Sequence, residues 1–289
     1  MQLNELENEF ALVGSTLIDG SGAEVKQDAV VAVKDGVIKH VGGRDSVQLD
    51  QGVQQVDVSG KFIMPGLINC HVHFLGCVSE YYVEWMTEPN EIQAIRTVNE
   101  ARKMLEWGFT TVRDCGSRYS LALKRAIDEG SAIGPRIVSS GLGISRTGGH
   151  GDLPRNIWAL DDEFIDHVHP WALRANGTDD IRKKVRRLIS QGVDMIKFWA
   201  TGGGYWEKDN YKHLHFTLDE MQVICDEAHE LDLRVGVHSK NFRSHKRVIE
   251  AGVDVIDHFY FCEGEEVDDE IIEKMLDNNI AFVPMCSIY

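Results

Sequence analysis

The chain has 289 residues, of which 43% are hydrophobic and 26% charged, a composition typical of a globular protein rather than a disordered or fibrous one. Its formal net charge of −16 argues against a nucleic-acid-binding protein, because contact with phosphates needs clustered Lys and Arg. The first residues, MQLNELENEF, lack the features of a signal peptide, and no apolar run is long enough to span a membrane. The six cysteines show no CxxC spacing, so we expect buried thiols in a cytoplasmic protein.

Residues 1–62 predict a small β-sheet domain. From about residue 10, short β-branched runs are separated by Gly, Asp and Ser turns. Lys34-Asp35-Gly36 lies between two apolar runs and predicts a hairpin turn, because glycine readily adopts the positive φ that such a turn needs.

From residue 63 onward, short apolar runs alternate with amphipathic stretches, which predicts parallel strands joined by crossover helices. The expected strands are 63–73, 110–114, 136–141, 193–200, 234–239, 253–259 and 280–286, and the expected helices are 90–107, 118–129, 178–191, 217–231, 242–251 and 268–278. In 217–231, Thr217 and Glu220 form a capping-box pattern, and apolar residues recur at helical steps from Leu218 to Leu231. Seven strands are one short of a closed (β/α)₈ barrel, and the longest irregular stretch is roughly 141–177.

Polar side chains end several of these strands, where the reactive groups of a (β/α)₈ barrel lie. His71 and His73 end the first strand, and their spacing of two directs both imidazoles to one face, where they could chelate one Zn²⁺. Alone, such a pair is more often a surface or core feature. His238 and His258 end the fifth and sixth strands, one β/α unit apart, and each alone is more often a satisfied core residue.

Lys197 lies inside the apolar run of the fourth strand. Burial would lower the pKa of its ammonium, and a neutral amine can add CO₂ to form an anionic carbamate with two oxygens for metal ions. The alternative is a lysine that pairs with a carboxylate or reaches the barrel rim.

The combination of HxH, Lys197, His238 and His258 on strands 1, 4, 5 and 6 resembles the amidohydrolase superfamily. The segments FIMPGLINCHVHF, TTVRDCG, GPRIVSSG, TGGHGD, MIKFWATGGG and VDVIDHF are similar to its branch of imidazolonepropionase-like enzymes and Xaa-Pro dipeptidases. The resemblance implies an α/β fold with a TIM-type (β/α)₈ barrel. Residues 63–289 would be the catalytic domain, truncated after strand 7, and residues 1–62 a small N-terminal β-sandwich domain that is incomplete without a C-terminal return.

The resemblance also implies a role for each residue. His71 and His73 would bind the more buried of two divalent metal ions, expected to be Zn²⁺, and His238 and His258 the second. Carboxylated Lys197 would bridge them, and a shared hydroxide would attack the substrate carbonyl and break a C–N bond. In the similar dipeptidases the histidine of TGGHGD, here His150, polarises the carbonyl; its alternative role is only to structure the loop.

Three departures from the family pattern stand out. No aspartate for strand 8 is found before Tyr289. Lys240 occupies a position where relatives often have Tyr or His facing the substrate, and it would suit an anionic group. The loop 154–177 either shapes the pocket or is a surface excursion; its Trp, Asp and His residues are Trp158, Asp161, Asp162, His167, His169 and Trp171.

The leading hypothesis is therefore a dipeptidase-like hydrolase of dipeptides or N-acyl amino acids. The alternatives are a hydrolase of cyclic amides or imidazolones, a truncated metal-binding fragment without activity, and a metal-free barrel that binds an anion through Lys197 and Lys240. We expect a small-molecule substrate, neither nucleic acid nor membrane as partner, and a possible homo-oligomer.

Overall fold

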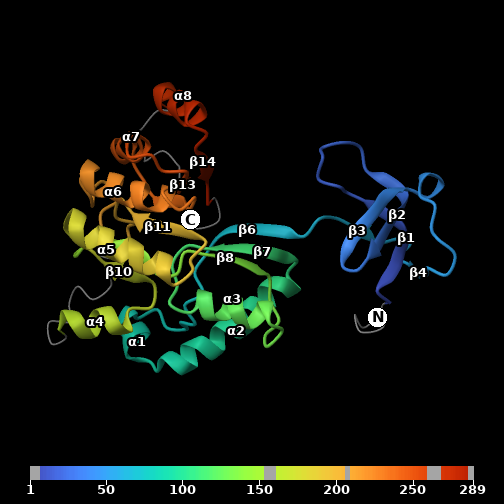
Figure 1. Cartoon of the computed structure of the whole chain (residues 1–289), viewed down its shortest axis with the longest axis horizontal. Coiled ribbons are helices and arrows are strands. Elements are labelled where there is room, and N and C mark those ends of the chain that lie inside the picture. Colours follow the sequence, from blue (N-terminus) through green and yellow to red (C-terminus); the bar gives the residue numbers. More distant parts are fainter. Residues whose placement is uncertain (1–6, 153–160, 206–208, 259–267, 286–289) are drawn as a thin grey trace. The chain divides into compact units, whose positions relative to one another are not determined.

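The computed structural model describes residues 7–152, 161–205, 209–258 and 268–285, and the chain divides into two compact units, Met1–Gly66 and Leu67–Tyr289 (Figure 1). Among the described residues, no helix combines the length and the apolar character needed to cross a membrane.

The first unit is built on one five-stranded sheet of order β3-β2-β1-β4, with β5 also paired to β1. Its strands are β1 (Glu9–Leu17), β2 (Lys26–Lys34), β3 (Val37–Gly43), β4 (Gln54–Asp57) and β5 (Phe62–Ile63), and a 3₁₀ helix spans Arg44–Ser46. Between the antiparallel β2 and β3, Asp35 and Gly36 have φ values of 52° and 73°, which confirms the predicted hairpin turn. The second layer of the expected β-sandwich stays a prediction.

The second unit contains the alternating strands and helices, and all of its strand pairings are parallel. A three-stranded sheet has the order β6-β7-β8, and a six-stranded sheet has the order β10-β9-β11-β12-β13-β14. These strands are β6 (Leu67–Val72), β7 (Phe109–Asp114), β8 (Arg136–Ser139), β9 (Gly143–Ser145), β10 (Ala172–Arg174), β11 (Met195–Trp199), β12 (Arg234–His238), β13 (Val255–Asp257) and β14 (Ala281–Val283).

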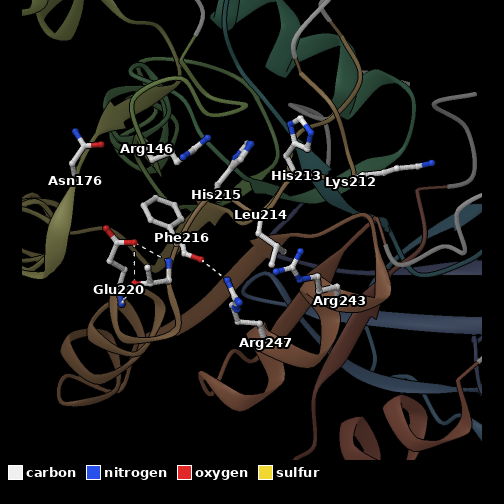
Figure 2. Close-up of a pocket in the computed structure, with 11 residues that line it drawn as sticks. Arg146, Asn176, Lys212, His213, Leu214, His215, Phe216, Glu220, Arg243 and Arg247 are labelled. Atoms are coloured by element: carbon white, nitrogen blue, oxygen red, sulfur yellow. Dashed lines mark hydrogen bonds between the residues drawn. The ribbon is translucent and has the colours of Figure 1, made fainter.

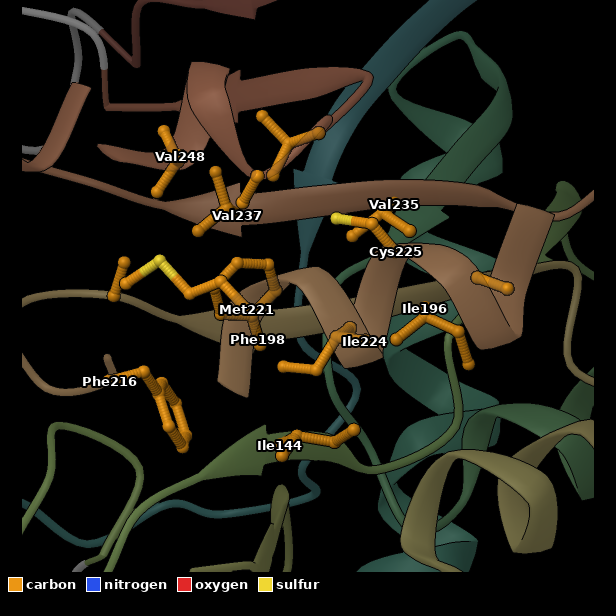
Figure 3. Packing of buried hydrophobic residues seen from close by; sticks show 14 of the residues in the cluster. Ile144, Ile196, Phe198, Phe216, Met221, Ile224, Cys225, Val235, Val237 and Val248 are labelled. Carbon is orange, nitrogen blue, oxygen red and sulfur yellow. The ribbon is translucent and has the colours of Figure 1, made fainter. Parts of the chain in front are cut away.

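Six helices follow the order expected from the sequence: α2 (Asn90–Glu106), α3 (Ser120–Asp128), α5 (Gly177–Ser190), α6 (Leu218–His229), α7 (Phe242–Glu250) and α8 (Asp269–Asp277). At the start of α6, the side chains of Thr217 and Glu220 form both hydrogen bonds of the predicted capping box. Met221 and Ile224 are fully buried, but Leu231 is 58% exposed because the helix ends two residues before it. Figure 3 shows α6 packed on β11 and β12 through this apolar face.

The stretch 141–177 is not irregular throughout, so this expectation was wrong in part. It contains β9, β10 and the short helix α4 (Asp162–Val168), and a further helix, α1 (Tyr82–Thr87), lies between β6 and α2. β9 and β10 have three residues each and, unlike the equally short β13 and β14, do not lie within a longer apolar run that would mark them in the sequence. They form here because β9 pairs with β10 and also with β11.

Candidate active site

A cavity of about 490 Å³ in the second unit collects most of the predicted site residues. Its lining combines four strand-end histidines and His150 with aromatic and apolar side chains. The lining residues are His71, Val72, His73, Leu75, Tyr82, Trp85, His150, Trp171, Trp199, Tyr205, His238, His258 and Met285. A lining of apolar and aromatic side chains with a few polar groups is typical of a site for a small organic molecule.

His71 and His73 direct their ring nitrogens toward each other at the end of β6, with 3.2 Å between the two Nε2 atoms. The Nδ1 atom of His73 lies 3.0 Å from the carbonyl oxygen of Gly116, which assigns the proton to Nδ1 and leaves the Nε2 lone pair available. Burial lowers the pKa of His71 to about 4 and that of His73 well below its usual value. Both rings are therefore neutral near pH 7, the form that binds metal ions.

Asp114 connects the residue after His73 with the loop that follows β7. Its carboxylate accepts hydrogen bonds from the backbone N–H of Phe74 at 2.9 Å and of Gly116 at 3.1 Å. Burial raises its pKa to about 7, although both backbone bonds act in the opposite direction. The residue that follows His73 and the residue that bonds its ring are thus tied to one carboxyl group.

His238 and His258 complete the histidine cluster. The ring of His258 lies 4.6 Å from that of His238 and 4.8 Å from that of His71, centroid to centroid. Burial lowers the pKa of both rings, so they too are neutral. The Nε2 atom of His238 also lies 3.1 Å from the carbonyl oxygen of Gly202.

His258 reaches the cluster through an unusual backbone conformation. The strand β13 ends at Asp257, and regular alternation would direct the next side chain to the opposite face. Instead, His258 has a φ of 62°, in the left-handed region that non-glycine residues rarely adopt. Asp257 and His258 are consequently both buried beside His71.

Lys197 is fully buried on β11, and its ammonium donates a hydrogen bond to Asp257. The same carboxylate accepts a hydrogen bond from Arg113 and lies 3.4 Å from Nδ1 of His71. Burial alone would raise the pKa of Asp257, but Lys197 and its other cationic neighbours hold it well below its usual range. Lys197 therefore pairs with a carboxylate, which was the alternative expected from the sequence. The partner, Asp257, was not among the predicted site residues.

Asp257 also belongs to a second group of possible metal ligands. Ligand atoms of His71, Cys115 and Asp257 all lie within 4.8 Å of one another. Burial raises the pKa of the Cys115 thiol to about 12, so the sulfur is protonated and a poor ligand. The four histidines, which are neutral without a metal ion, are better candidate ligands than this thiol.

His150 is held in place by Asp209. Its Nδ1 atom lies 2.8 Å from a carboxylate oxygen of Asp209, and its ring stacks on that of His238 at 4.4 Å. Burial raises the pKa of Asp209, but the hydrogen bond and charge of His150 and the backbone N–H groups of Tyr205 and Gly203 together outweigh it, and the pKa is lowered. Nothing in the sequence around Asp209 indicated this contact, which depends on how the loop after β11 folds back.

Lys240 does not line the cavity formed by the described residues. It is buried, its ammonium donates to the carbonyl oxygen of Gly203 at 2.8 Å, and it lies 5.8 Å from the centroid of the Tyr205 ring. Its contact with a substrate stays a prediction.

The loop 154–177 contributes to the cavity through Trp171. The Trp171 ring lies 5.4 Å from that of His73 and 5.7 Å from that of His150, and its indole N–H donates to the carbonyl oxygen of Gly151. Asp161 instead caps α4, and His167 is exposed. His169 is buried, while Trp158 and the side chain of Asp162 lie outside the described residues.

Comparison with known proteins places this site in a family. The Amidohydrolase family model matches residues 62–287. The chain is 30% identical to an ochratoxinase of Aspergillus niger over 290 residues, which cover 94% of the chain and 58% of that protein. It is 24% identical to a probable imidazolonepropionase of Homo sapiens, covering 86% of the chain and 60% of the relative.

Two solved structures are also similar. A prolidase complexed with N-methylphosphonate-L-proline has a TM-score of 0.84 at 32% identity, covering 96% of this chain and 66% of that one. The Aspergillus niger ochratoxinase has a TM-score of 0.85 at 26% identity, covering 98% and 66%. The chain thus spans 58–66% of the length of these relatives. The chain belongs to the amidohydrolase family, as the arrangement of its histidines and Lys197 predicted.

Proposed function

We propose that the protein is a binuclear metal-dependent hydrolase that cleaves an amide-type C–N bond. The observation that carries the proposal is the convergence of four neutral imidazoles on one cavity lined with aromatic rings, with a buried lysine–carboxylate pair beside His71. A neutral imidazole keeps a nitrogen lone pair that a divalent metal ion can bind, and the Nε2 atoms of His71 and His73 lie 3.2 Å apart.

The residues fit two metal ions, for which Zn²⁺ is the first choice. His71 and His73 would hold one ion, because their Nε2 atoms already face each other, and His238 and His258 would hold the other. Bound metal ions of this kind lower the pKa of coordinated water and polarise a carbonyl group.

Lys197 is proposed to bridge the two ions as a carbamate. The ammonium would first lose one proton, and the neutral Nζ atom would then form a bond to the carbon of CO₂ and lose a second proton, so that a cation becomes an anion with two ligand oxygens. The position of Lys197 supports this role, because its ammonium bonds the carboxylate of Asp257, which lies 3.4 Å from Nδ1 of His71. Asp257 would then keep Arg113 as its cationic partner.

His150 is proposed to hold and protonate the substrate carbonyl. With Nδ1–H directed at Asp209, the neutral ring presents the Nε2 lone pair, and the protonated ring presents an N–H donor. Burial lowers the pKa of His150, and the adjacent carboxylate acts in the opposite direction by favouring the protonated form. The dyad can therefore take up a proton and donate it to a developing oxyanion or amine.

Dipeptides and N-acyl amino acids are the favoured substrates. The aromatic rings around the cavity suit an apolar side group next to the scissile bond, and the similarity to an ochratoxinase and a prolidase points to amide-type substrates. Cyclic amides and imidazolones are the second candidate, supported by the likeness to the probable imidazolonepropionase.

The test is a hydrolysis screen on the full chain after chelation and reloading with Zn²⁺ or Mn²⁺. N-acyl amino acids, dipeptides and cyclic amides are compared by release of amine, with His71→Asn as the inactive variant and His167→Asn as an exposed control. We expect activity on open-chain amides that needs added metal and is lost in His71→Asn alone. A loaded chain with two metal equivalents but no turnover would contradict the hydrolase proposal, and activity confined to rings would overturn the substrate choice.

A further inference from the structure

A second cavity, of about 590 Å³, lies in the same unit as the candidate active site but shares no lining residue with it (Figure 2). It is formed by the end of β9, the segment before α6, and the exposed face of α7. Its lining residues are Arg146, Asn176, Lys212, His213, Leu214, His215, Phe216, Thr217, Glu220, Arg243 and Arg247.

The cavity is cationic in a strongly acidic protein. Four of its lining residues, Arg146, Lys212, Arg243 and Arg247, are cations, against the single carboxylate of Glu220, although the chain carries a net charge of −16. Within the described ranges, none of these four cations lies within 4.0 Å of a carboxylate. Their positive charge is therefore not cancelled by direct ion pairs with described residues.

The one carboxylate in the lining is already engaged. Glu220 accepts hydrogen bonds from the backbone N–H of Thr217 at 2.8 Å and of Gly177 at 2.9 Å. Its carboxylate oxygens therefore accept hydrogen bonds from residues at the starts of α6 and α5 and not from the arginines.

Three guanidinium groups face this space from two sides. Arg243 and Arg247 are four residues apart on one face of α7, and Figure 2 shows both extending toward the segment 214–216. Arg247 is fixed by a hydrogen bond from Nη1 to the carbonyl oxygen of Phe216 at 3.1 Å. Across from them, the Nε atom of Arg146 is buried, and it has no hydrogen-bond partner among the described residues.

A buried donor without a partner and two like charges on adjacent helical turns are both unfavourable unless a ligand compensates them. Guanidinium groups bind phosphate and carboxylate oxygens in pairs of parallel hydrogen bonds. We infer that this cavity binds a small molecule through its oxyanion groups, with Arg146, Arg243 and Arg247 as the binding residues. A nucleic acid is a poor fit, because the basic residues form one pocket and no extended stripe.

The test is calorimetric titration of the full chain, metal-free, with inorganic phosphate and with citrate at constant ionic strength. We expect one of the two to bind with a millimolar or lower Kd, and Arg243→Gln to weaken that binding at least tenfold. Arg102→Gln removes another exposed positive charge, on α2, and should leave the Kd unchanged. Arg243 is exposed, so its replacement should leave the melting temperature within a degree or two.

The two probes separate the sources of the oxyanion. Phosphate binding alone assigns a phosphorylated ligand, and citrate binding alone assigns a polycarboxylate. Arg146→Gln provides a second variant, with the same loss of affinity expected. Absence of binding by both anions, or equal Kd values for Arg243→Gln, Arg146→Gln and Arg102→Gln, would overturn the inference.

Discussion

Replacing Lys197 with methionine should strongly destabilise the metal-free chain, because the ammonium is one of two cations that neutralise a buried carboxylate. The side chains of Lys197 and Asp257 are both 0% exposed, while Arg113, the remaining cation, is 13% exposed. Removing one partner of a buried ion pair typically costs about 3–5 kcal/mol. Since Arg113 still pairs with Asp257, we expect a loss near the lower limit, about 3 kcal/mol of unfolding free energy.

The assay is urea unfolding of the chelated chain followed by tryptophan fluorescence, since all six tryptophans lie in the second unit. The double variant Lys197→Met/Asp257→Asn removes both charges and should regain much of the loss, because a neutral replacement of a whole buried pair is often tolerated. Lys274→Met, which breaks an exposed pair with Glu270, should cost less than about 1 kcal/mol. If Lys197→Met costs no more than Lys274→Met, or if the two single losses simply add, the reasoning about this pair is wrong.

Three further predictions concern the candidate site. Asp209→Asn should lower kcat/KM by about 10- to 100-fold in steady-state assays, because His150 loses its orienting carboxylate; an unchanged value would refute that role. Asp114 has a folded pKa raised to about 7 from 3.8, so it should stabilise the fold at acidic pH, an effect lost as pH rises through about 7. The unfolding free energy of wild type relative to Asp114→Asn should therefore fall by a few kcal/mol between pH 4 and 7, and parallel pH profiles would argue against it. At His258, with its φ of 62°, Asn should be tolerated, whereas Val should cost about 1–2 kcal/mol more in urea unfolding; equal stability of the two variants would exclude strain there.

Much of the fold could be predicted from local patterns. Apolar periodicity located six helices and seven strands of the second unit in the correct order, and the capping pattern at Thr217 marked the start of α6 correctly. These signals work where an element shows its period over several residues or lies within a longer apolar run, as the short strands β13 and β14 do. The equally short strands β9 and β10 lie in no such run, and only their tertiary pairing reveals them.

The candidate site was predictable only in part. His71, His73, His238 and His258 could be found because strand ends meet at one face of a barrel. Asp257 stood beside His258 in the sequence, but alternation along a strand gives the two residues opposite faces. The left-handed backbone at His258 buries the side chains of both Asp257 and His258. A histidine in the sequence does not predict this conformation. Asp209 contacts His150 across 59 residues, a distance over which sequence periodicity carries no information.

The salt bridge between Lys197 and Asp257 has a consequence for how an active enzyme would mature. Addition of CO₂ requires a neutral amine, yet the amine here is engaged by a carboxylate in the barrel interior. Under the proposed function, the rate of activation after chelation would then depend on how often this bridge opens and on the supply of bicarbonate, and less on the zinc concentration. Newly made protein would pass through a lag before its first turnover, and weakening the bridge with Asp257→Asn would shorten that lag.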